Sequence, residues 1–173
     1  MTNIRLRKLS LSDTANIVRW RNQPEVYQNL FNQQPITEAQ HTAYYRKYIE
    51  TGIIKQYIVE SDFDGQTVDI GTTFLKNIDQ VSKKAEFGIF IGESSARGRG
   101  LASAIVTATL AVAFEELHLN RVYLTVFSSN ESAIRAYQKS GFKQEGVLRQ
   151  DFYDGHQYVD VVMMGILRTD YGK

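Results

Sequence analysis

The stretch "SARGRGLASAI", Ser95–Ile105, decides how this sequence is interpreted, because two arginines and two glycines stand where a strand gives way to a helix. The first backbone N–H groups of a helix have no partner inside it, and the helix dipole adds partial positive charge there. Gly98 and Gly100 can adopt positive φ and let a ligand approach the backbone closely. Arg97 and Arg99 add charge. The stretch is therefore either a phosphate cradle or a basic patch for nucleic acid, and it matches neither the P-loop nor the dinucleotide fingerprint.

The overall charge argues against nucleic acid as a partner. The chain of 173 residues has 20 basic and 19 acidic residues, a net charge of +1. A dedicated nucleic-acid binder has a clear basic excess, because neutralised phosphates supply most of its affinity. No apolar run reaches the roughly 18 residues that span a bilayer. The N-terminus lacks the apolar core of a signal peptide, so we expect no membrane partner and a soluble, cytoplasmic protein.

Metal and thiol chemistry have little support. There are no cysteines, which excludes disulfides, thiolate nucleophiles and cysteine zinc sites. His41, His118 and His156 are spaced too widely for a metal signature, so we expect no metal site.

Strands and helices alternate along the chain. Period-2 alternation, β-branched residues and turn signals predict strands at 3–11, 56–61, 67–78, 84–92, 121–127, 142–153 and 156–167. Apolar periodicity and capping signals predict helices at 12–22, 38–50, 100–117 and 130–141, with a further helical piece at 24–31. Thr37 and Gln40 form a capping box, and Asn130 and Gly141 bound the last helix. This pattern predicts an α/β protein with a mixed sheet.

Two motifs in order resemble one family. "ARGRGLA" matches the acyl-CoA signature [Q/R]-x-x-G-x-[G/A] of the GNAT superfamily of N-acetyltransferases. The downstream stretch "NESAIRAYQKSGF" matches the pattern N-x-x-A-x-x-x-Y-x-K-x-G-F at Asn130, Ala133, Tyr137, Lys139, Gly141 and Phe142. The likeness runs from about Ile4 to Leu167. It is closest to the branch of ribosomal-protein N-terminal, spermidine and amino-sugar-nucleotide N-acetyltransferases.

The resemblance implies a fold and a reaction. Residues 1–173 would form a single N-acetyltransferase domain, a mixed, centrally splayed β-sheet of about seven strands flanked by about four helices. Acetyl-CoA would be the co-substrate, and a primary amine would attack it directly in a ternary complex. A CoA-binding module that senses acetyl-CoA without turnover is the alternative from another class.

The resemblance also assigns the co-substrate site. The pyrophosphate would lie on the backbone amides of Arg97, Gly98, Arg99, Gly100, Leu101 and Ala102. The pantetheine arm would pair like an extra strand with the backbone of Ile89, Phe90 and Ile91. Asn130 is placed where the family contacts pantetheine, and it is equally well explained as a helix N-cap.

Tyr137 is the candidate general acid. It follows Asn130 by two helical turns, so both face the same side. A phenol with a reference pKa of about 10 stays protonated near neutral pH and can protonate the departing thiolate. Packing of an aromatic residue in the core is the competing interpretation.

Glu86 is the candidate general base, acting on the acceptor amine through an ordered water. Some family members place a glutamate on the strand before the second motif, where this chain has Thr125. A strand-end charge that faces solvent explains Glu86 nearly as well.

The acceptor site is the least defined. Trp20, Arg21 and Asn22, followed by Pro24, resemble a W-R-N-x-P stretch of the amino-sugar-nucleotide branch and of neighbouring ribosomal-protein enzymes. They would hold the acceptor, or they form a solvated helix face with Trp20 in the core. The acceptor candidates are an amino-sugar nucleotide or a protein N-terminal amine, with a polyamine such as spermidine as the alternative. The resemblance also suggests a homodimer.

Overall fold

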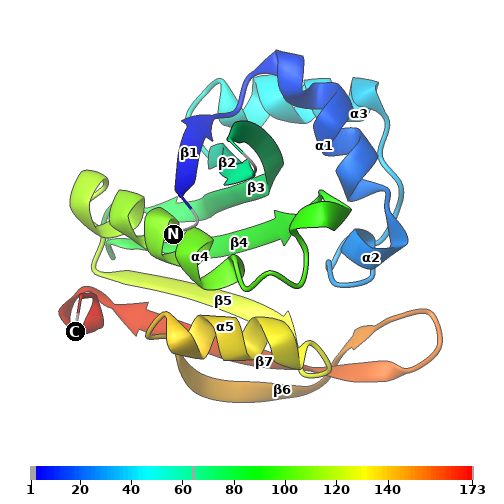
Figure 1. The fold of residues 1–173 in the computed structure, drawn as a ribbon. Helices are drawn as coiled ribbons and strands as arrows, with labels where there is room; N and C mark the ends of the chain where they lie inside the picture. The colour runs from blue at the N-terminus through cyan, green and yellow to red at the C-terminus, as the bar shows by residue number, and fades with distance from the viewer. Residues whose placement is uncertain (1–2, 64, 173) are drawn as a thin grey trace.

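The computed structural model describes residues 3–63 and 65–172, which form one seven-stranded sheet with helices on both faces (Figure 1). The strands are β1 (Ile4–Lys8), β2 (Lys55–Phe63), β3 (Gln66–Asp79), β4 (Lys84–Ile91), β5 (Arg121–Phe127), β6 (Lys143–Tyr153) and β7 (Tyr158–Leu167). The α-helices are α1 (Thr14–Arg21), α2 (Pro24–Tyr27), α3 (Glu38–Tyr44), α4 (Ala102–Ala111) and α5 (Glu131–Lys139). Short helical turns flank them: η1 (Leu11–Asp13), η2 (Tyr45–Ile49), η3 (Ser94–Ala96), η4 (Val112–Glu116) and η5 (Arg168–Asp170).

The sheet opens in its middle. Its strand order is β1-β2-β3-β4-β5-β7-β6, and within the described chain only the β4–β5 pair is parallel. These two strands pair over three positions, the last being Glu86 with Tyr123. Beyond that point they diverge, as Figure 1 shows, so that β4 from Phe87 to Ile91 has no partner on its β5 side. The mixed sheet predicted from the sequence pattern is confirmed, and so are the central splay and the seven strands that the family resemblance implied.

The two faces of β4 pack against different helices. Phe87 and Ile89 contact a core cluster that contains α4 residues and Tyr137 of α5. Phe90, one residue out of step, packs with Trp20 and Ile17 of α1 in a separate cluster. Because successive side chains of a strand point to opposite faces, α4 and α5 cover one face of β4 and α1 the other.

Local sequence signals set several helix ends. Thr37 Oγ1 accepts from the backbone N–H of Gln40, and the Gln40 side chain accepts from the N–H of Thr37, which completes the predicted capping box. Asn130 caps α5, and Gly141 follows that helix with φ +94°. The helix predicted at 100–117 begins only at Ala102, because Gly98 and Gly100 both have positive φ.

In residues 3–63 and 65–172, none of the helices has both the length and the apolar character that crossing a bilayer requires.

Candidate active site

A single cleft of about 970 Å³ runs along the opening between β4 and β5. At one end, which we call the loop end, it is lined by the loop after β4, the open edge of β4 and α5. At the other end it continues between the sheet and the helices α1 to α3. We call this second end the helical compartment; its lining includes Arg21, Ile36, His41, Gln56, Phe74 and Glu86.

The loop end is built from backbone rather than from side chains. Gly98 and Gly100 have φ of +71° and +73°, and a Cβ placed on either would meet no atom within 4 Å. Both glycines are therefore required by backbone conformation, not by crowding inside the protein. The free N–H groups at the start of α4 follow immediately, and Leu101 and Ala102 line the cleft. This concave, amide-rich surface fits a pyrophosphate.

The two arginines of the loop have different surroundings. Arg97 Nη2 donates to the carbonyl of Gly92 at 2.8 Å and to the side chain of Gln23, and its Nε donates to the carbonyl of Ile91 at 3.2 Å. Its guanidinium therefore ties the loop to the end of β4 and to the residue before α2. Arg99 does not line the cleft and lies over the ring of Phe63, 5.0 Å from its centroid.

The open edge of β4 borders the same cleft. Ile89, Phe90 and Ile91 all line it, and each pairs on its other side with β3. The backbone on the β5 side is left without a strand partner. This edge can therefore accept an extended chain as an added strand.

Tyr137 and Asn130 reach the cleft from α5. Tyr137 is only 8% exposed, and its ring packs against Phe87 and Phe142 with centroids 6.0 and 5.9 Å away. It therefore combines core packing with a position on the cleft wall, so the two interpretations drawn from the sequence are compatible. Burial raises the pKa of the Tyr137 phenol above its ordinary value. Asn130 accepts from the N–H of Ala133 at 3.3 Å, as an N-cap does.

Glu86 lines the cleft at the last position where β4 and β5 pair. Its carboxylate accepts from Asn77 Nδ2 at 2.8 Å and lies 3.1 Å from Lys76 Nζ. The side chain is only 20% exposed, so it is not a free charge at a strand end. Two neighbours hold it against the floor of the helical compartment.

Of the three residues predicted to bind the acceptor, one lines the cleft. Trp20 has no exposed surface, does not line the cleft and donates to Glu93 Oε1 at 2.7 Å. Its expected contact with the acceptor is corrected here, because a fully buried indole packs in the core. Asn22 makes two hydrogen bonds to the backbone of Ile36, at 2.8 and 2.9 Å, and so positions the wall of the compartment. Arg21 alone lines the cleft, where its Nη2 donates to the carbonyl of Asn32.

Sequence reasoning missed two polar residues of the compartment. Gln56 of β2 pairs with Phe74 of β3, which pairs with Gly88 of β4, so these three form a row across the floor. His41 of α3 is 4% exposed and its Nδ1 lies 3.0 Å from Thr14 Oγ1. Neither belongs to a motif, so only the sheet register and helix packing bring them together.

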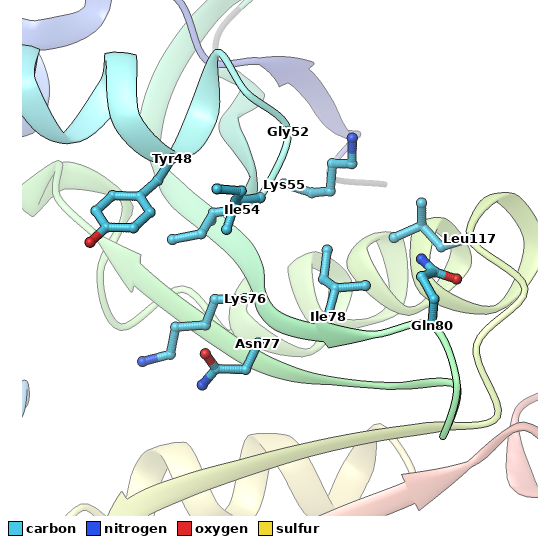
Figure 2. A pocket seen from close by; sticks show the side chains of 10 residues that line it. Tyr48, Gly52, Ile54, Lys55, Lys76, Asn77, Ile78, Gln80 and Leu117 are labelled. Atoms are coloured by element: carbon cyan, nitrogen blue, oxygen red, sulfur yellow. The ribbon is translucent and has the colours of Figure 1, made fainter.

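A second hollow, of about 570 Å³, lies on the far side of Lys76 (Figure 2). Ile54 and Lys76 line both this hollow and the cleft. Its other lining residues include Tyr48, Ile78 and Leu117, which Figure 2 labels around an open, mainly apolar surface.

Two relatives and one solved structure resemble this chain over nearly its whole length. The chain is 29% identical over 170 residues to a spermidine N(1)-acetyltransferase of Vibrio cholerae, covering 98% of this chain and 96% of the relative. A crystal structure of the Vibrio cholerae spermidine N-acetyltransferase in complex with CoA and spermine superimposes with a TM-score of 0.90, at 29% identity and with 98% of each chain covered. An L-amino acid N-acetyltransferase of Escherichia coli is 29% identical over 164 residues, covering 95% of this chain and 98% of the relative.

The family model described as "Acetyltransferase (GNAT) domain" matches residues 3–143, the part of the chain that holds the glycine loop, the open edge of β4 and α5. Fold, motifs and family model agree. The chain belongs to the GNAT family, and it is an acetyl-CoA-dependent N-acetyltransferase.

Proposed function

We propose that this enzyme transfers the acetyl group of acetyl-CoA to a primary amine of a small molecule that binds in the helical compartment. The observation that carries the proposal is the continuity of the cleft: one cavity joins the glycine loop, the open edge of β4, Tyr137 and Glu86. Two substrates bound at its two ends would meet at the splay. Direct attack needs no covalent intermediate on the enzyme, and the chain has no cysteine to form a thioester.

In the proposed reaction the neutral amine attacks the thioester carbonyl carbon, a C–N bond forms and the C–S bond breaks. Tyr137 donates its phenolic proton to the departing thiolate sulfur, and the tyrosinate is neutralised by a proton that leaves the new amide nitrogen. Before attack, the ammonium form of the acceptor loses one further proton through water to Glu86, which passes it to solvent. The net reaction yields an N-acetyl amide, free CoA and one proton.

The chain's residues fit these roles chemically. The raised pKa of Tyr137 keeps the phenol protonated over the neutral range, as a general acid requires. Lys76 and Asn77 hold the Glu86 carboxylate on the compartment floor. The backbone amides of Arg97 to Ala102 would hold the pyrophosphate, and the open edge of β4 would orient the thioester.

The relatives favour a different acceptor from the two expected first. A polyamine has better support than an amino-sugar nucleotide or a protein N-terminal amine, because the relative and the solved structure that cover nearly the whole chain are named for spermidine. However, a relative of equal identity is named for L-amino acids. The names alone therefore support a primary amine and make spermidine the first acceptor to test.

The test is release of CoA thiol from acetyl-CoA with separate acceptors: spermidine, an L-amino acid, an amino-sugar nucleotide and a peptide with a free N-terminus. The proposal predicts amine-dependent release together with an equal amount of N-acetylated amine detected by mass spectrometry. Binding of acetyl-CoA without release for any amine would instead favour the non-catalytic sensing module.

A further inference from the structure

Several residues of the helical compartment carry unpartnered polar atoms. In the part of the chain that the structure describes, four buried side-chain nitrogen or oxygen atoms have no hydrogen-bond partner. Three of them, Arg21 Nη1, His41 Nε2 and Gln56 Oε1, belong to residues that line the cleft. A buried polar atom without a partner is costly, so three such atoms in the lining of one cleft indicate a ligand that supplies the missing partners. The hollow of Figure 2 has no such atom.

The orientation of Gln56 is fixed by its neighbour. Thr72 Oγ1 donates its one proton to the carbonyl of Tyr57 at 2.7 Å, so it can only accept from Gln56, whose Nε2 lies 3.0 Å away. The carbonyl oxygen of Gln56 is therefore the group left free. The side chain is 7% exposed, and its free oxygen can accept from an ammonium or hydroxyl group of a ligand.

Arg21 contributes an unmatched cation. Nη2 donates to the carbonyl of Asn32, which carries no formal charge, and no carboxylate lies within 4.0 Å of the guanidinium among the described residues. Burial lowers the pKa of Arg21, since removal from water disfavours the charged form. An anionic oxygen group would satisfy Nη1 and offset that penalty with a charge-assisted hydrogen bond.

His41 adds a third polar atom from the neighbouring helix. Thr14 Oγ1 pairs with Nδ1 of the imidazole, and the buried Nε2 is left without a partner. The charged group that acts on the imidazole is Asp13, which precedes α1 and is itself paired with Arg7. A neutral imidazole can donate to a second oxygen of the same anionic group.

The carboxylates of the cleft are poorly suited to a bare polyamine. Only Glu25 and Glu86 carry a carboxylate among its lining residues, against five residues with a cationic side chain: Arg21, Lys76, Arg97, Arg135 and Lys139. Glu86 is matched by Lys76, and Glu25 is 64% exposed beside Arg97. Arg97, Arg135 and Lys139 stand on the loop and on α5 at the loop end, so the cations of the compartment are Arg21 and Lys76. Among the described lining residues of the compartment, a ligand with several ammonium groups would meet the one carboxylate of Glu86, which Lys76 already pairs.

We propose that Arg21, His41 and Gln56 form a subsite for an anionic oxygen group of the acceptor, so that the acceptor is an amine that also carries a carboxylate or a phosphate. This proposal rests on the proposed function and narrows its acceptor to an amine that carries an anion, in place of the bare polyamine for which the relatives are named. Arg21 and His41 supply donors to the anion, and Gln56 accepts from a neighbouring donor of the same molecule. The amine of that molecule extends toward Glu86.

Matched pairs of amines test the subsite by binding. Calorimetry in the presence of saturating CoA would compare lysine with 1,5-diaminopentane, and O-phosphoethanolamine with ethanolamine; each pair differs only in its anionic group. At least one anionic member is expected to bind about 10- to 100-fold more tightly than its partner. A preference in the first pair assigns a carboxylate, and one in the second assigns a phosphate. Equal binding within both pairs, no binding of any member, or tighter binding of spermidine would overturn the proposal.

Variants of the proposed subsite test which residues cause the tighter binding of the anionic amine. Arg21→Met should abolish it, whereas Arg19→Met removes the same charge from the same helix outside the cleft lining and should leave it intact. Gln56→Glu keeps the shape of the side chain and adds a negative charge, so it should also reduce the preference if Arg21→Met fails to fold. A preference that survives both Arg21→Met and Gln56→Glu in folded protein would overturn the assignment.

The CoA-release assay separates this proposal from the proposed function. A binding preference without acetyl transfer would leave the subsite standing and refute the catalytic role. Acetyl transfer to all amines without an anion preference would support the catalytic role and refute the subsite.

Discussion

The two ends of the cleft are built on different principles. The loop end presents backbone to the cleft: two glycines at positive φ, the first turn of α4 and an unpaired strand edge. The helical compartment is lined by side chains from α1, α3, β2 and β4, which lie far apart in the sequence.

This difference separates two ways in which a binding surface can be built. The backbone surface at the loop end depends on a short local pattern of residues. A compartment of side chains can change residue by residue while the sheet stays the same. Relatives at equal identity that are named for spermidine and for L-amino acids are consistent with this division.

The largest effect is expected where the two ends meet. Tyr137→Phe removes the phenolic proton but keeps the ring between Phe87 and Phe142. We expect kcat to fall about 10²- to 10⁴-fold, with the Kd for acetyl-CoA unchanged. Rapid-quench kinetics and calorimetry measure the two quantities, and Tyr158→Phe, on an exposed tyrosine, is the matched control. An unchanged kcat would remove Tyr137 as the acid.

Glu86→Gln tests the compartment floor. The amide can still accept from Asn77 but no longer takes a proton, so kcat should fall about 10²-fold and the pH–rate profile should change shape. Glu25→Gln alters the other carboxylate of the cleft and should leave the profile as it is. If the Glu86→Gln profile matches that of the unaltered enzyme, another group is the base.

Gly100→Val tests the loop end. A β-branched residue at φ +73° strains the backbone by roughly 1–3 kcal/mol, so the Kd for acetyl-CoA should rise about 10- to 100-fold. Arg99→Ala should raise it less than about 3-fold, because that guanidinium lies over Phe63 outside the cleft lining. Calorimetry on both variants measures the two Kd values for acetyl-CoA. The reverse order would mean that charge, not backbone shape, holds the co-substrate.

The smallest effect concerns stability at the compartment. Burial lowers the pKa of His41, so below about pH 6.5 the unfolded chain binds a proton that the folded protein resists. The free energy of unfolding should therefore decrease as pH falls from about 6.5 toward that lowered pKa, by at most about 1.4 kcal/mol per pH unit. Urea denaturation at several pH values measures the slope. His41→Gln should reduce it and His156→Gln, on the surface, should not; equal slopes in all three proteins would refute the assignment.

The candidate co-substrate site at the loop end could be predicted from the sequence because its residues form short contiguous motifs. Gly98, Gly100 and the start of α4 lie within a few residues, and Asn130 and Tyr137 lie on one short helix. The splay was implied by the resemblance to the GNAT superfamily; the alternation of residues 84–92 predicted only the strand itself.

The residues that line the helical compartment could not be predicted from local motifs in this way. Trp20 stands in a motif with Arg21 and Asn22, yet helical periodicity turns it into the core and leaves Arg21 at the cleft. Gln56 and His41 reach the site only through sheet register and the packing of α3 on α1, neither of which a local pattern specifies.

The central claim is that one cleft holds both substrates at once and that the amine attacks acetyl-CoA directly. It is tested by initial velocities measured while the concentrations of acetyl-CoA and amine are both varied. We expect double-reciprocal plots of velocity against substrate concentration to give intersecting lines, because a ternary complex must form before acetyl transfer. Parallel lines would show that the acetyl group is first passed to the enzyme and would contradict it.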